Sequence, residues 1–80
     1  MAPRAAFEKE LREWITGLAE RPVRVNSRLF EDDYLDSLKI LNLIAFLESR
    51  LRIRIPDDKV TLDNFASVRH ISNAFWNESR

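Results

Sequence analysis

The chain has 80 residues, which is enough for one small domain, and we expect residues 1–80 to form it. It contains no cysteine, which excludes disulfides and thiolate metal sites, so thiol chemistry would need a cofactor. The 13 Lys and Arg residues balance 13 Asp and Glu residues, and this zero net charge gives no indication of nucleic-acid binding.

The N-terminal segment predicts an amphipathic helix over residues 5–20, preceded by Pro3 and stopped by Pro22. Charged residues cover one side of it. The N-terminus has no long apolar stretch, so we expect neither a signal peptide nor membrane insertion, and a cytoplasmic protein. The apolar residues at helical spacing are Phe7, Leu11, Trp14, Ile15 and Leu18.

Residues 21–36 have no sustained helical period and predict a long ordered loop pinned by Val23, Val25, Leu29 and Phe30. Long loops in compact domains are usually functional or disordered, and the apolar residues favour the first option.

The next helix is expected to begin at Asp36-Ser37-Leu38, with Asp36 as its N-cap. Its apolar residues go beyond one stripe, which predicts a central helix or one that presents part of its surface to a partner. The predicted core stripe is Ile40, Leu43, Ile44, Leu47 and Leu51, and the extra apolar residues are Leu38, Leu41, Ala45 and Phe46.

The C-terminal third predicts one short and one longer helix. Residues 50–55 alternate like a strand, but no second run exists to pair with them, so we interpret them as a helix end and an extended stretch closed by Pro56. A short helical turn follows at Asp57-Asp58, and Val60, Leu62 and Phe65 are expected to face inward. Ser67 is the expected N-cap of the last helix, whose core residues are Val68, Ile71 and Phe75.

These elements predict an all-α bundle with three main helices, one short helix and a long first loop. Little in it suggests catalysis. His70 is the only histidine and has no partners at the spacing of a metal site or a catalytic triad. One glycine cannot build a phosphate-binding loop. We therefore expect neither an enzyme nor a metal site.

The most informative feature is Asp36-Ser37-Leu38 at the start of the most apolar helix. A helix N-terminus carries unpaired N–H groups and favours phosphate, although Asp36 offsets part of that gain. Alone, the tripeptide is compatible with two capping residues. The tripeptide is more specific when it is taken together with the segments that follow it, which are Leu47-Glu48, residues 53–58 and Phe65-Ala66-Ser67-Val68.

With this spacing the chain resembles the acyl carrier protein family, which includes peptidyl and aminoacyl carrier domains, from about Leu29 to Phe75. The resemblance implies a four-helix bundle in which a phosphopantetheinyl transferase attaches 4′-phosphopantetheine from coenzyme A to Ser37, between Asp36 and Leu38. The thiol of this arm would hold an acyl or aminoacyl group as a thioester. The residues that the resemblance assigns to partner binding are Leu38, Lys39, Leu41, Ala45 and Ile55.

The chain also departs from the carriers of fatty acid synthesis. Those are usually acidic, whereas Lys39 and Asn42 stand here where carboxylates are common, and only Glu48 remains between Ser37 and Arg52. A basic docking patch would be repelled or weakly steered by such a surface. We therefore expect a specialised, stand-alone and monomeric carrier, served by an adenylate-forming ligase or by synthase or acyltransferase enzymes. In the segment before the motif, where the family often has a glycine, this chain has Asp33. Aspartate adopts the left-handed backbone conformation more readily than most residues, so it can replace the glycine in such a turn.

Three alternatives stay open. Within the family, the chain could serve fatty acid or polyketide elongation. Outside it, the chain could be an unmodified helical module whose apolar helix binds a partner. A nucleic-acid stripe at Arg50, Arg52 and Arg54 is disfavoured by neighbouring acidic residues and the zero net charge, so these arginines are interpreted as a solvated face.

Overall fold

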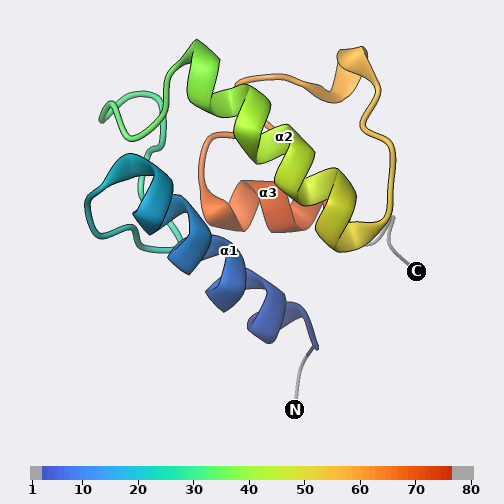
Figure 1. Ribbon diagram of the computed structural model, residues 1–80, viewed down its shortest axis with the longest axis horizontal. Helices are drawn as coiled ribbons and strands as arrows, with labels where there is room; N and C mark the ends of the chain where they lie inside the picture. The colour runs from blue at the N-terminus through green and yellow to red at the C-terminus, as the bar shows by residue number, and fades with distance from the viewer. Residues whose placement is uncertain (1–2, 77–80) are drawn as a thin grey trace.

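The computed structural model describes residues 3–76, which form a small bundle of three α-helices and one short 3-10 helix (Figure 1). The bounds are Pro3–Ala19 for α1, Ser37–Leu51 for α2, Asp57–Lys59 for the 3-10 helix η1 and Val68–Phe75 for α3. Within residues 3–76 there is no strand, which confirms the all-helical prediction and the interpretation of residues 50–55. No helix in this range is long and apolar enough to cross a membrane.

Helices α1 and α2 lie side by side and run in opposite directions (Figure 1). Trp14 of α1 stacks on Phe46 of α2 with ring centroids 4.5 Å apart. One turn earlier in α1, Glu10 pairs with Arg50, one turn later in α2, at 2.8 Å. Because the two pairs occur in opposite order along the two helices, the helices are antiparallel.

Helix α3 packs against the N-terminal half of α1 and lies behind α2 in Figure 1. The Nε of Arg4 donates a hydrogen bond to the hydroxyl of Ser72 at 2.7 Å, which satisfies a fully buried serine. The Phe7 ring stacks on Trp76 with centroids 5.2 Å apart. The two ends of the described chain are therefore tied together.

The core lies where the apolar faces of the three helices meet. In α1, Phe7, Leu11 and Ile15 are fully buried, while Trp14 and Leu18 pack at its edge. The helical spacing thus predicted the buried face of α1 correctly. The other core residues are Val23, Leu29, Leu35, Leu43, Leu47, Leu51, Ile55, Phe65, Val68, Ile71 and Phe75.

Residues 20–36 form the ordered loop that the sequence predicts. Its backbone is hydrogen-bonded to the segment before α3 and to the first turn of α3, with Leu29 N–H donating to Ala66 C=O and Arg69 N–H donating to Val25 C=O, each at 2.9 Å. The Arg21 guanidinium lies 3.8 Å over the centroid of the Tyr34 ring and so joins the two ends of the loop. These contacts fix the approach to α2.

Helix boundaries follow local chemistry. α1 begins at Pro3 rather than at Ala5, because proline lacks only an N–H that the first turn does not use. Glu20 has φ 60°, a left-handed conformation that ends α1 at Ala19 rather than at Glu20. Arg52, with φ 57°, ends α2 in the same way.

One expected core residue is exposed. Phe65 is buried and Val60 is partly buried as predicted, but Leu62 is 71% exposed, so its predicted inward orientation is wrong. The physical reason is a polar turn around it, in which Asn64 N–H donates to the Thr61 hydroxyl at 3.1 Å. That turn directs the Leu62 side chain outward, to the edge of the pocket described below.

Candidate functional site

Asp36 caps α2, as the sequence predicts. Its backbone is extended, with φ −129° and ψ −175°, and its carboxylate accepts hydrogen bonds from Leu38 N–H at 3.0 Å and Lys39 N–H at 2.9 Å. Ile40 N–H donates to Asp36 C=O at 3.0 Å and forms the first helical hydrogen bond. Asp33 precedes this cap with φ 59°, so aspartate does adopt the left-handed conformation expected of it in the approach.

Because Asp36 supplies the cap, the neighbouring Ser37 hydroxyl is left free. Ser37 is the first residue of α2, its side chain is exposed, and it has no hydrogen-bond partner within residues 3–76. Ser67, the cap of α3, shows the opposite arrangement. It is only 3% exposed, and its hydroxyl accepts from His70 N–H at 3.1 Å and lies 2.7 Å from His70 Nδ1.

The other serines within residues 3–76 lack this combination of features. Ser72 is fully buried, and Ser27 is half-buried and accepts a hydrogen bond from Arg24 N–H at 2.9 Å. Ser49 is exposed but lies near the C-terminal end of α2, where the helix dipole is negative. Ser37 is therefore the described serine that joins an accessible hydroxyl to the positive end of a helix.

Ser37 also borders an apolar pocket of about 300 Å³ between the start of α2, the long loop and the segment after η1. Ile40 lines this pocket, which explains why it is half-buried rather than part of the central core. The Ser37 hydroxyl is thus beside a space that favours apolar groups. The remaining lining residues are Phe30, Val60, Thr61, Leu62 and Phe65.

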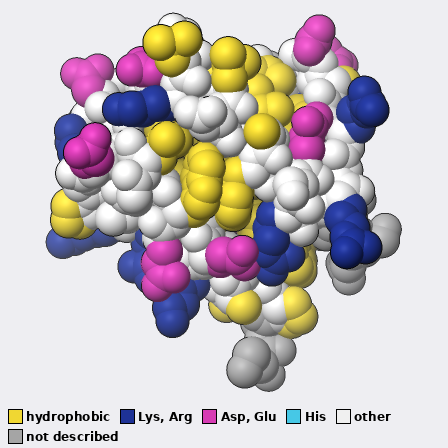
Figure 2. Space-filling view, viewed as in Figure 1, with side chains coloured by type: hydrophobic (Ala, Val, Ile, Leu, Met, Phe, Trp, Pro, Cys, Tyr) yellow, Lys and Arg dark blue, Asp and Glu magenta, His cyan; other side chains and the backbone are white. Residues whose placement is uncertain are grey.

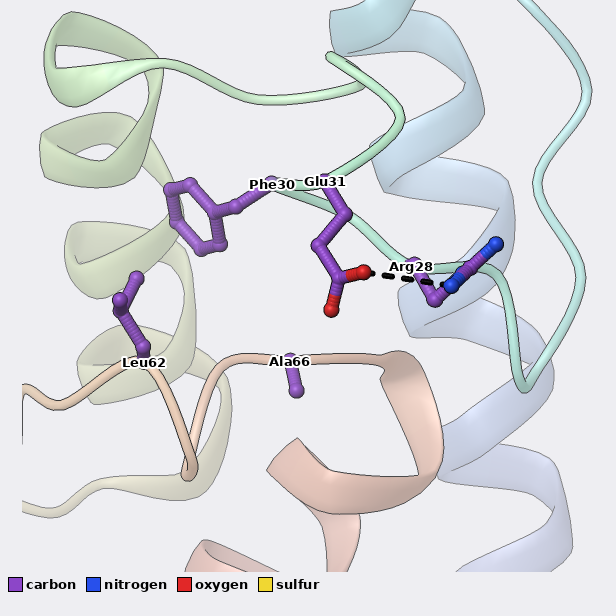
Figure 3. Close-up of a pocket in the computed structure, with 5 residues that line it drawn as sticks. All are labelled: Arg28, Phe30, Glu31, Leu62 and Ala66. Carbon is purple, nitrogen blue, oxygen red and sulfur yellow. Dashed lines mark hydrogen bonds and ion pairs between the residues drawn. The ribbon is translucent and has the colours of Figure 1, made fainter.

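A second pocket of about 90 Å³ adjoins the first, because Phe30 and Leu62 line both (Figure 3). In Figure 3 the Leu62 side chain points up from the 60–66 segment toward the Phe30 ring. On the other side, Arg28 and Glu31 form a surface ion pair at 3.2 Å. The apolar space beside Ser37 therefore ends in a charged rim.

Three of the four predicted partner-facing residues of α2 are exposed. Leu38 is 76% and Leu41 is 62% exposed, Ala45 is also exposed, and Lys39 is half-buried. Figure 2 shows hydrophobic side chains gathered over the N-terminal half of α2. Exposed apolar patches often mark sites of protein contact.

Ile55 is different, and its predicted place on the partner-facing surface is wrong. Its side chain is 7% exposed and belongs to the core. The left-handed Arg52 turns the chain back at the end of α2, and Glu48 then accepts a hydrogen bond from Ile55 N–H at 2.9 Å. This bond holds the extended segment against the bundle, so alternate side chains point inward.

Sequence reasoning missed two features of the site. It assigned no role to Thr61 and placed Leu62 in the core, although both line the pocket beside Ser37. The polar residues Thr61, Asp63 and Asn64 around Leu62 were the available signal for a turn. The local sequence does not show that this turn lies beside Ser37, because that position depends on tertiary packing.

The first turn of α2 offers favourable electrostatics for an anionic group. A phosphate on Ser37 would lie at the positive end of the α2 dipole, in the same turn as the Lys39 ammonium, and would be partly opposed by the Asp36 carboxylate. No cluster of metal-binding side chains occurs in the described part of the chain. No protein-family model, no curated protein and no solved structure matches the chain.

The cap at Asp36 gives a stability change that depends on pH. The hydrogen bond from Lys39 N–H, aided by that from Leu38 N–H, lowers the pKa of Asp36 below its ordinary value of 3.8. A carboxyl with a lowered folded-state pKa stabilises the fold above its unfolded pKa, and this contribution is lost as the pH falls through the folded pKa. We expect Asp36→Asn to unfold at lower urea than the wild type at neutral pH, with the two curves converging as the pH falls through the lowered folded-state pKa of Asp36.

Urea titrations at several pH values check this expectation. Asp63→Asn is the matched control, since Asp63 is an exposed carboxylate that caps no α-helix. A difference between wild type and Asp36→Asn that stays constant over the whole acid titration would show that the charge of the cap contributes nothing.

Proposed function

We propose that the chain is a carrier protein that holds acyl or aminoacyl intermediates as thioesters on a 4′-phosphopantetheine arm esterified to Ser37. The observation that carries the proposal is the free, exposed Ser37 hydroxyl at the first position of α2, with the cap supplied by Asp36 instead. A serine that must be esterified has to be accessible and unengaged. In this reading the fold is a four-helix carrier bundle in which η1 is the short helix.

The surroundings of Ser37 support the same proposal. Ser37 and its neighbour Leu38 are both exposed, and Lys39 of the same turn is half-buried, so a transferase can reach the serine from solvent. The pocket beside it can accept part of an apolar group. The arm would supply the thiol that a chain without cysteine lacks. The chain itself would contribute the attachment point and the favourable field of the helix end.

The charge of α2 bears on which pathway the proposed carrier serves. Glu48, its only carboxylate, is engaged with the backbone of Ile55 rather than facing outward among the exposed residues. This favours a specialised carrier, served by an adenylate-forming ligase or by other loading enzymes, over a carrier for fatty acid or polyketide elongation. The competing class, an unmodified interaction module, is supported by the exposed Leu38 and Leu41 alone.

Loading in vitro tests the proposal. The purified chain is incubated with coenzyme A, Mg²⁺ and a broad-specificity phosphopantetheinyl transferase, and its intact mass is measured. We expect complete conversion to a species that is heavier by one phosphopantetheinyl group. A chain that keeps its original mass, while an acyl carrier protein in the same tube is converted, would be an unmodified module.

A further inference from the structure

The exposed face of α2 presents no carboxylate. At spacings of three and four residues this face carries apolar side chains near Ser37, then small and polar ones, and finally an arginine beyond the last turn. Glu48 is turned to the backbone of Ile55 at 2.9 Å. The face therefore changes from apolar to basic along the helix. Its residues, all exposed, are Leu38, Leu41, Asn42, Ala45, Ser49 and Arg52.

The basic end of this face carries positive charge that is not neutralised by an ion pair within residues 3–76. Arg50 is committed to Glu10 at 2.8 Å. Arg52 and Arg54 are exposed, and neither has a hydrogen-bond or ion-pair partner within residues 3–76. At the opposite end of α2, Asp33 and Asp36 are exposed in the residues that lead into the helix, and Lys39 of the first turn is half-buried, so the exposed charge there is negative. A partner thus meets leucines between a negative end and a positive end.

We propose that the enzyme that loads or unloads the arm docks here, with an apolar socket over Leu38 and Leu41 and with carboxylates opposite Arg52 and Arg54. This inference rests on the proposed function of Ser37. Leu38 and Leu41 lie in the first two turns of α2, so a partner that contacts them is next to the attachment point. The charges set the orientation of the partner. In the reversed orientation its carboxylates would lie at the Ser37 end and would be repelled by Asp33 and Asp36.

A protein surface fits this face better than a nucleic acid does. Leu38 and Leu41 are 76% and 62% exposed and offer nothing to a phosphate backbone. At this end of the face, only Arg52 and Arg54 are exposed arginines without a partner within residues 3–76, which is little positive charge for a phosphate backbone. Complementary charge raises association rates and selects among partners.

The test uses one probe enzyme in two forms. The first is a fatty acid ketosynthase with a basic docking patch, and the second is the same enzyme with the lysines and arginines of that patch changed to glutamate. The chain is loaded with a pantetheine analogue that alkylates the ketosynthase cysteine, and cross-linking rates are measured. We expect the charge-reversed enzyme to react about tenfold faster or more, and this advantage to shrink with salt.

Variants of the chain make the readout specific. Arg52→Glu/Arg54→Glu should invert the preference between the two ketosynthases. Leu41→Ala should slow both reactions. Arg24→Glu, which reverses an exposed charge in the loop outside α2, should leave the ratio of the two cross-linking rates unchanged.

The outcomes separate this inference from the proposed function. Equal rates, a preference for the basic enzyme, or no cross-linking by a chain whose mass shows the arm would overturn the docking inference and leave the carrier proposal standing. A chain that never gains the arm removes both. Binding of a labelled single-stranded RNA oligomer at physiological salt, lost in Arg52→Glu/Arg54→Glu, would assign the arginines to nucleic acid and also overturn the inference.

Discussion

Replacing Ser37 by alanine is expected to abolish loading with phosphopantetheine completely. The change removes the only atom to which the proposed arm is bonded, so no partial activity should survive. It should leave the fold intact, because the Ser37 side chain is exposed, makes no hydrogen bond within residues 3–76 and does not cap α2. Alanine is also a good helix former at this position. The intact mass after incubation with transferase and coenzyme A should equal that of the untreated variant.

Ser49→Ala is the matched control for this experiment. It removes the other exposed serine hydroxyl of α2, at the opposite end of the helix, and should load like the wild type. Circular dichroism of both variants establishes that the fold is retained. Loading of Ser37→Ala, or loss of loading in Ser49→Ala alone, would move the attachment point away from the start of α2.

Leu47→Ala is expected to destabilise the domain by about 2–5 kcal/mol. Leu47 is fully buried in the core, so truncation loses apolar burial and leaves a cavity. Small domains have a total stability of roughly 5 kcal/mol or little more. We therefore expect the melting temperature to fall by more than about 10 °C, with much of the protein unfolded at physiological temperature.

Leu41→Ala is the control on the same helix. Leu41 is 62% exposed, so the same chemical change should alter the free energy of unfolding by less than about 0.5 kcal/mol. Urea unfolding followed by circular dichroism measures both variants. Equal losses of stability in the two would mean that α2 does not bury the face on which Leu43, Leu47 and Leu51 lie.

Features set by neighbours in the sequence were predictable. Asp36 and Ser67 cap helices because a short polar side chain reaches N–H groups two or three residues away, whatever the rest of the fold does. The buried stripe of α1 follows from helical spacing in the same local way. The prediction of an accessible Ser37 hydroxyl is therefore a consequence of which residue precedes it.

Features set by the return of the chain were not predictable. Ile55 and Leu62 are both apolar residues between helices, and although the polar residues around Leu62 indicate a turn, nothing local shows which of the two side chains is buried. Ile55 is buried because Glu48, seven residues earlier, holds its N–H, whereas a turn built by Thr61 and Asn64 directs Leu62 outward. The pocket beside Ser37 depends on that turn, since its walls come from three separate segments.

Peptide mapping of the loaded chain tests the central claim most directly. Trypsin cleaves after Arg28 and Lys39, and the resulting peptide, residues 29–39, has Ser37 as its only serine. We expect the added mass on this peptide, with fragmentation assigning it to Ser37. The account would be contradicted if the added mass were found on residues 40–50, which contain Ser49, or on no peptide at all.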